Sequence, residues 1–180
     1  MDRLKIATIW LGGCSGCHMS FLDLDEWLIE LVGKAEIVYS PLMDIKEFPK
    51  GVDATLVEGA VANRDNLELL RTVRANSKLI IAFGDCAVTG NVTAMRNIIE
   101  CPRRALETAY LQLSAGNKSI PNEPGILPEL LTPVVPIHQV VAVDAFIPGC
   151  PPSAQRIKLA LELLLNGQPV ILPPEELKFG

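Results

Sequence analysis

The chain has 180 residues, 49% of them hydrophobic and 21% charged, and its formal net charge is −5. The high apolar fraction excludes a disordered chain, and the length predicts a single globular domain over residues 1–180. The acidic balance and an aromatic content of only 5% argue against nucleic-acid binding, which uses basic surfaces and stacking side chains. We also expect no membrane span, because no apolar stretch is long enough for one.

The first half of the chain alternates short apolar runs with longer helical patterns. Residues 5–10 form a compact β-prone run, and residues 18–32 follow with apolar positions at helical spacing. Two further strands are predicted at residues 36–39 and 53–58, and a second helix is predicted from about residue 64 to residue 76.

The second half begins with residues 78–83, the clearest strand pattern of the sequence. A last strand is predicted at residues 140–147, followed by a helix at residues 153–165. Strands that alternate with helices indicate a parallel sheet covered on both faces. We therefore predict an α/β fold with a flavodoxin-like doubly wound parallel sheet, whose ligand site lies outside the carboxyl ends of the strands.

Residues 116–139 do not fit this alternation, because they carry five prolines. A helix is predicted to begin near Cys101 and Pro102, ahead of this segment. A structureless loop of such length is uncommon in a compact domain. The apolar residues between 126 and 135 favour an ordered Pro-rich extension that lies on a partner, with a surface excursion as the open alternative.

Four of the five cysteines follow directly after predicted strands. Cys14 and Cys17 form a Cys-x-x-Cys pair after the first strand, Cys86 follows the fourth, and Cys150 follows the last. Because the carboxyl ends of parallel strands meet at one edge of a sheet, we expect these four thiols to converge. Cys101 lies at the start of a helix elsewhere and is expected to be a bystander.

Four converging thiols predict a metal centre, and a [4Fe–4S] cluster held by Cys14, Cys17, Cys86 and Cys150 is the best fit. A structural zinc site normally uses two Cys-x-x-Cys pairs, and a thioredoxin-like dithiol would leave Cys86 and Cys150 unexplained. Both remain alternatives. FMN is possible in this fold, but no phosphate-binding glycine motif supports it. The sequence offers no catalytic residue of its own.

Three segments, residues 13–17, 84–87 and 148–152, resemble the motifs of [NiFe]-hydrogenase small subunits, a family related to the cluster-bearing small subunit of respiratory complex I. Complex I relatives carry adjacent cysteines in the first motif, so the Cys-x-x-Cys spacing is similar to the hydrogenases. Residues 17–23 further resemble the short small subunit of cytoplasmic NAD-reducing, bidirectional enzymes. Met19 stands where many small subunits have Glu, so a proton route through that Glu is not carried over.

The resemblance implies an electron-transfer subunit that carries the proximal [4Fe–4S] cluster. It would relay electrons between the Ni–Fe site of a separate large subunit and a diaphorase with flavin and iron–sulfur centres that reduces NAD. The implied location is the cytoplasm. An iron–sulfur relay subunit of a complex I-like oxidoreductase without hydrogen chemistry is the alternative, and a dithiol module is a more distant one.

A few polar residues near these motifs carry weaker hypotheses. Asp85 and Thr89 either hydrogen-bond within the cysteine loop or cap a local turn. His18 lines the cluster pocket or the partner contact, or simply begins a helix. Glu58 ends a strand at the same edge and is expected to face the partner, and His138 is expected to be structural.

Overall fold

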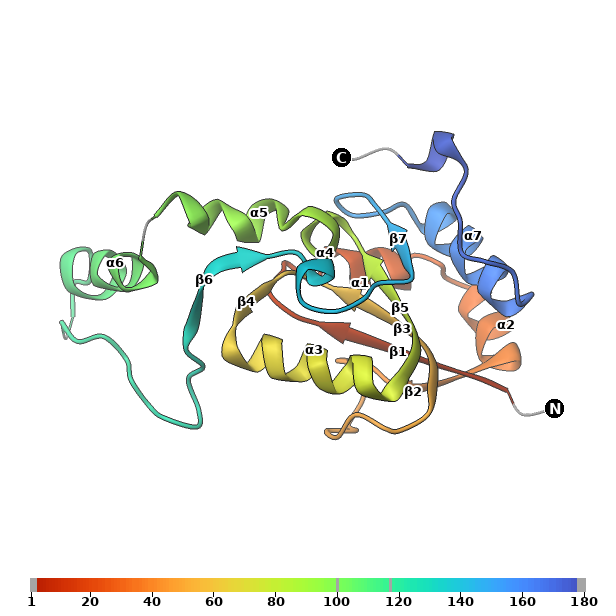
Figure 1. Cartoon of the computed structure of the whole chain (residues 1–180), viewed down its shortest axis with the longest axis horizontal. Helices are drawn as coiled ribbons and strands as arrows, with labels where there is room; N and C mark the ends of the chain where they lie inside the picture. The colour runs from red at the N-terminus through yellow and green to blue at the C-terminus, as the bar shows by residue number, and fades with distance from the viewer. Residues whose placement is uncertain (1–2, 100, 117, 178–180) are drawn as a thin grey trace.

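The structure is a computed structural model that describes residues 3–99, 101–116 and 118–177, and its centre is a five-stranded parallel sheet. The strand order is β2-β1-β3-β5-β7, which is the flavodoxin-like doubly wound order. The predicted fold class is thus confirmed (Figure 1). The strands are β1 (Leu4–Trp10), β2 (Ala35–Tyr39), β3 (Val52–Glu58), β5 (Ser77–Phe83) and β7 (Ala145–Ile147).

Helices cover both faces of this sheet. One core contains Phe21, Leu31 and Leu161 from three helices, and the other contains Leu70 and Val73 from a fourth. Four consecutive residues in the middle of β1 are buried, as expected for a strand covered on both sides. The helices are α1 (Gly16–Leu22), α2 (Trp27–Lys34) and α7 (Ala154–Leu165) on one face and α3 (Arg64–Asn76) on the other.

The predicted helix over residues 18–32 is wrong in its continuity, because α1 and α2 are separated by a turn. Asp25 in that turn has a φ of 49°, which a continuous right-handed helix does not allow. The predicted strand over 140–147 is likewise too long. The carboxylate of Asp144 accepts the N–H of Ile80 at 2.7 Å, so a side chain takes the place of a ladder bond just before β7 begins.

The region between β5 and β7 contains short elements that the sequence pattern did not resolve. Figure 1 shows α6 (Pro102–Glu107) at one end of the molecule, away from the main sheet. Beyond it, β6 (Leu130–Val135) pairs antiparallel with β4 (Val61–Asn63). The remaining elements are α4 (Asp85–Thr89), α5 (Asn91–Ala94), η1 (Met95–Ile98), α6 (Pro102–Glu107), η2 (Thr108–Gln112), η3 (Ile137–Gln139) and η4 (Pro174–Glu176).

The Pro-rich extension is therefore ordered, but its second half packs on the chain itself. Val134 of β6 is 2% exposed and lies in a small core with Ala60 and Ala62. Ile126 and Leu127, which precede β6, are exposed. The expectation that the whole segment lies on a partner is thus wrong for β6.

Across the described ranges, no helix combines the length and the apolar character that crossing a membrane requires.

Candidate metal centre

Three cysteine-bearing loops leave the carboxyl edge of the main sheet. Cys14 and Cys17 follow β1, Cys86 lies in α4 directly after β5, and Cys150 follows β7. The first of these loops lies where the strand order diverges, between β1 and β3. In open α/β sheets this is the position at which ligands bind.

Backbone hydrogen bonds join the second and third cysteine loops. The N–H of Gly84 donates to the carbonyl of Ile147 at 2.8 Å, and the N–H of Asp85 donates to the carbonyl of Gly149 at 2.9 Å. The buried Asp85 carboxylate accepts the N–H of Gly149 at 2.6 Å. Asp85 therefore bridges two loops, which is the first of the two roles expected for it.

The first loop packs directly against the other two. The hydroxyl of Ser20 donates to the carbonyl of Pro152, next to the third loop. Gly84 has a φ of +84°, and a Cβ at this position would lie 2.1 Å from the Sγ of Cys17. Only a residue without a side chain allows this approach. The three loops therefore converge at one edge of the sheet.

A buried carboxylate accepts hydrogen bonds from the backbone of the first loop. Glu58, at the end of β3, is 1% exposed and accepts the N–H of Cys17 at 3.4 Å and the N–H of His18 at 3.0 Å. It also pairs with Nδ1 of His18, whose Nε2 lies 3.0 Å from the hydroxyl of Thr8. The expectation that Glu58 faces a partner is wrong, because its side chain is committed to this loop.

The four thiols influence one another electrostatically. Burial raises the pKa of Cys17, and the charges of Glu58 and of the three thiols of Cys86, Cys14 and Cys150 raise it further. Burial also raises the pKa of Cys86, against the effect of hydrogen bonds from Thr93. The positive charge of a coordinated metal deprotonates such thiols to thiolates. The donor set thus fits a metal centre.

Two kinds of centre use cysteine thiols as ligands. Within residues 3–99, 101–116 and 118–177, no three His, Cys, Asp or Glu side chains are grouped as ligands of one metal ion. Tetrahedral zinc requires its donors at about 2.3 Å from a single ion. A [4Fe–4S] cluster spreads four cysteine ligands over several irons. Four cysteine thiols are a donor set that either kind of centre can use.

Two polar residues at this edge were not found from the sequence. The side-chain amide of Asn91 donates to the Sγ of Cys150 at 3.2 Å, and the hydroxyl of Thr93 donates to the carbonyl of Gly12 at 2.8 Å. Their position just after the second cysteine motif is the one feature of the sequence that could have indicated them. Cys101 directly precedes α6, which lies away from this edge, and its side chain makes no capping hydrogen bond.

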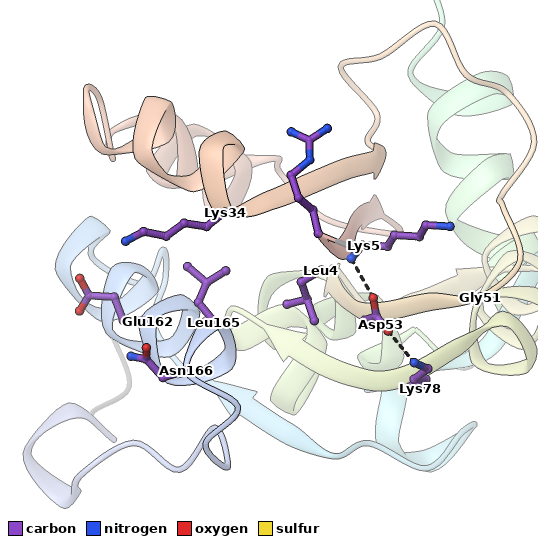
Figure 2. Close-up of a pocket in the computed structure, with 10 residues that line it drawn as sticks. Leu4, Lys5, Lys34, Gly51, Asp53, Lys78, Glu162, Leu165 and Asn166 are labelled. Atoms are coloured by element: carbon purple, nitrogen blue, oxygen red, sulfur yellow. Dashed lines mark hydrogen bonds and ion pairs between the residues drawn. The ribbon is translucent and has the colours of Figure 1, made fainter. Parts of the chain in front are cut away.

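A cavity of about 730 Å³ lies at the opposite, amino edge of the sheet (Figure 2). Figure 2 shows Lys34 and Lys5 extending in opposite directions, while Lys78 pairs with Asp53. These charged groups do not converge on a common point, and none of the residues that line the cavity is a cysteine. The cysteine edge is therefore the stronger candidate for the functional site.

Comparison with known proteins agrees with this geometry. Residues 14–164 match the family described as NADH ubiquinone oxidoreductase, 20 kDa subunit. The chain belongs to this family. The 20 kDa subunit family match extends over all three cysteine loops, and it confirms the relationship to complex I that the motifs predicted.

The hydrogenase branch of the resemblance is confirmed as well. The chain is 42% identical to the NAD-reducing hydrogenase HoxS subunit delta of Cupriavidus necator, over 95% of this chain and 83% of that subunit. It superposes with a TM-score of 0.93 and 39% identity on a chain from a crystal structure of NAD⁺-reducing [NiFe]-hydrogenase in the H₂-reduced state, covering 99% of this chain and 100% of that one.

An archaeal relative is 33% identical over 96% of this chain. It is the iron-sulfur subunit of an F420-non-reducing hydrogenase from Archaeoglobus profundus, and the chain spans 58% of its length. The matched span therefore takes in the segments that carry the three cysteine loops of this chain.

Proposed function

We propose that this chain is the electron-transfer small subunit of a cytoplasmic NAD-reducing [NiFe]-hydrogenase. Its four edge cysteines, Cys14, Cys17, Cys86 and Cys150, would hold one proximal [4Fe–4S] cluster. The partners would be a large subunit with the Ni–Fe site and a diaphorase with flavin and iron–sulfur centres. The observation that carries the proposal is the convergence of three cysteine loops at the carboxyl edge of the sheet.

Other residues of this chain would hold the cysteine ligands of such a cluster in place. When bound, a [4Fe–4S] cluster accepts and donates single electrons. Glu58 fixes the backbone of Cys17, and Asp85 fixes Gly149 beside Cys150, so the ligands keep their places when the charge changes. Rigid ligands reduce the reorganisation that accompanies electron transfer.

No proton or hydride chemistry is assigned to this chain. The two buried carboxylates of the site, Glu58 and Asp85, are committed to hydrogen bonds with loop backbone. The chain also lacks a nicotinamide-binding glycine motif. Splitting of dihydrogen and reduction of NAD would therefore take place on the partners, in agreement with a relay role.

Exposed apolar side chains beside the cysteine loops support a partner at this edge. Trp10 ends β1, Met19 follows Cys17 in α1, and Val92 lies in α5 next to Asn91. All three are exposed, Met19 at 60%. A large subunit seated here would cover both the exposed Cys14 and Cys150 and this apolar surface.

Anaerobic purification followed by iron and acid-labile sulfide analysis tests the cluster. We expect about four irons and four sulfides per chain, lost in Cys86→Ser and Cys150→Ser. Cys101→Ser is the matched control and should keep the full content. An iron-free chain with thiol–disulfide exchange activity would establish the dithiol alternative, and one zinc per chain would establish the zinc alternative. A flavin assay of the acid extract tests for FMN.

Co-purification with the neighbouring subunits tests the reaction. We expect hydrogen-dependent reduction of NAD⁺ that disappears when Cys86→Ser is introduced. The match to the complex I subunit family favours one second candidate, a relay in an oxidoreductase without hydrogen chemistry. Electron transfer from NADH to a quinone, with no hydrogen consumed or evolved, would establish that candidate instead.

A further inference from the structure

Asn91 makes a contact that none of the three cysteine motifs accounts for. Its side-chain amide Nδ2–H donates to the Sγ of Cys150 at 3.2 Å. The two residues are 59 positions apart in sequence and belong to different loops. A side-chain amide is therefore aimed at one of the four sulfurs of the candidate site.

The backbone around Asn91 fixes the direction of this amide. Gly90 and Asn91 both have positive φ, 90° and 33°, and Asn is one of the few residues that adopts this conformation readily. The hydroxyl of Thr89 donates to the carbonyl of Asp85 at 2.9 Å and accepts the N–H of Asn91 at 3.3 Å. The backbone of Asn91 is thus hydrogen-bonded to Thr89, next to the second cysteine loop, while the Asn91 side chain reaches Cys150 of the third loop.

Thr93, two residues further on, extends the same arrangement to the first loop. Its hydroxyl donates to the carbonyl of Gly12 at 2.8 Å. Burial raises the pKa of the Cys86 thiol, and hydrogen bonding from Thr93 opposes that rise. The Asn91–Thr93 turn therefore contacts all three cysteine loops. It places the side-chain amide of Asn91 within hydrogen-bond distance of the Cys150 sulfur.

We propose that Asn91 is a positioning residue that raises the reduction potential of the bound cluster through its hydrogen bond to Cys150. The inference rests on the proposed function, since it requires a cluster on the four cysteines. Reduction adds one electron, and no bond in this chain forms or breaks. The added negative charge spreads onto the sulfur ligands, and an N–H donor to one of them favours the reduced form. A higher potential favours uptake of electrons from the hydrogen-splitting partner.

The test is a redox titration of the full chain under anaerobic conditions, with dithionite as reductant and the EPR signal of the reduced cluster as readout. Asn91→Gly removes the amide and suits the positive φ. Asn91→Asp keeps the shape but replaces the donor with a negative charge. Asn166→Asp adds the same charge at the opposite edge, beside the cavity of Figure 2, and is the matched control.

We expect Asn91→Gly to lower the equilibrium constant for one-electron reduction about tenfold, which corresponds to about 59 mV. Asn91→Asp should lower it further, and Asn166→Asp should leave it unchanged, with iron content retained in all three. Retained iron with an unshifted potential in Asn91→Gly would overturn this inference alone. A wild-type chain without iron would overturn the proposed function and this inference with it.

Discussion

The two ends of strand β3 carry one carboxylate each, and the two behave differently. Glu58 at the carboxyl end is 1% exposed and bonds to the backbone of Cys17 and to His18. Asp53 at the amino end accepts the N–H of Lys5 and pairs with Lys78, whose side chain is 74% exposed. The carboxylate at one end of β3 is thus buried, with hydrogen bonds to the first cysteine loop. The carboxylate at the other end belongs to an ion pair whose lysine is exposed to solvent.

A cavity alone is therefore a poor guide to the functional site of this chain. The amino end has the cavity of Figure 2, but the Lys78 side chain of its Asp53–Lys78 ion pair is exposed to solvent. The side chains of Lys5 and Lys34 point in opposite directions there. At the carboxyl end, buried polar groups fix three loops around the thiols. A buried polar network is costly when broken, whereas an exposed ion pair contributes little. Variants at the two ends should therefore differ sharply in effect.

The largest effect is expected for Gly84→Ala at the carboxyl end. The new Cβ would lie 2.1 Å from the Sγ of Cys17, at a φ of +84°. We expect a loss of roughly 3–5 kcal/mol in the free energy of unfolding and loss of bound iron, because the loops must separate. Urea denaturation and iron analysis measure the two effects.

Gly33→Ala is the control for this change. Gly33 lies in α2, and a Cβ there would have no neighbour within 4 Å. Ala in a helix is favoured over Gly by about 1 kcal/mol, so this variant should be slightly more stable and keep its iron. If Gly84→Ala behaved like Gly33→Ala, the close contact of the first two cysteine loops would be wrong.

The convergence of the cysteine loops was predictable from the sequence for a topological reason. Strand runs such as residues 78–83 are recognisable by composition, and parallel strands place their carboxyl ends at one edge. The position of Cys86 or Cys150 after such a run then fixes the edge on which it lies. Local pattern and chain topology suffice for this step.

The contacts that hold the loops were not predictable, because they depend on how distant segments pack. In the sequence, Glu58 is a residue at the end of a strand and was expected to face a partner. Only the packed structure shows that its carboxylate accepts the N–H of Cys17. Asn91 and Cys150 lie 59 positions apart, and no local pattern joins them. The break at Asp25 and the short β7 have the same origin, since backbone conformation and a side-chain bond from Asp144 override the apolar pattern.

Glu58→Ala is expected to have the second largest effect. It leaves the N–H groups of Cys17 and His18 without their acceptor and Nδ1 of His18 without its partner, all in a buried position. We expect the free energy of unfolding to fall by about 3 kcal/mol, as when one member of a buried pair is removed. Urea denaturation of the anaerobically purified chain measures it.

The matched variant for that change is Asp53→Ala at the other end of the same strand. Its expected cost is below about 1 kcal/mol, because the Lys78 partner is mostly solvated. Equal losses in the two variants would show that the two ends of β3 do not differ in the way described.

The smallest effect is the pH dependence of the Asp53 interaction. Burial by itself would raise the pKa of Asp53, but hydrogen bonds from Lys78 and from the N–H of Lys5 hold it below its ordinary value of 3.8. A carboxyl group with a lowered pKa in the folded state stabilises the fold above its ordinary pKa, and this stabilisation is lost as the pH falls through the folded-state pKa. The stability difference between wild type and Asp53→Asn should therefore be below about 1 kcal/mol at neutral pH, weaken in high salt and shrink below pH 3.8. A difference that persisted unchanged in acid and in salt would mean that the amide disturbs packing, and that the amino end is less solvated than its exposed Lys78 indicates.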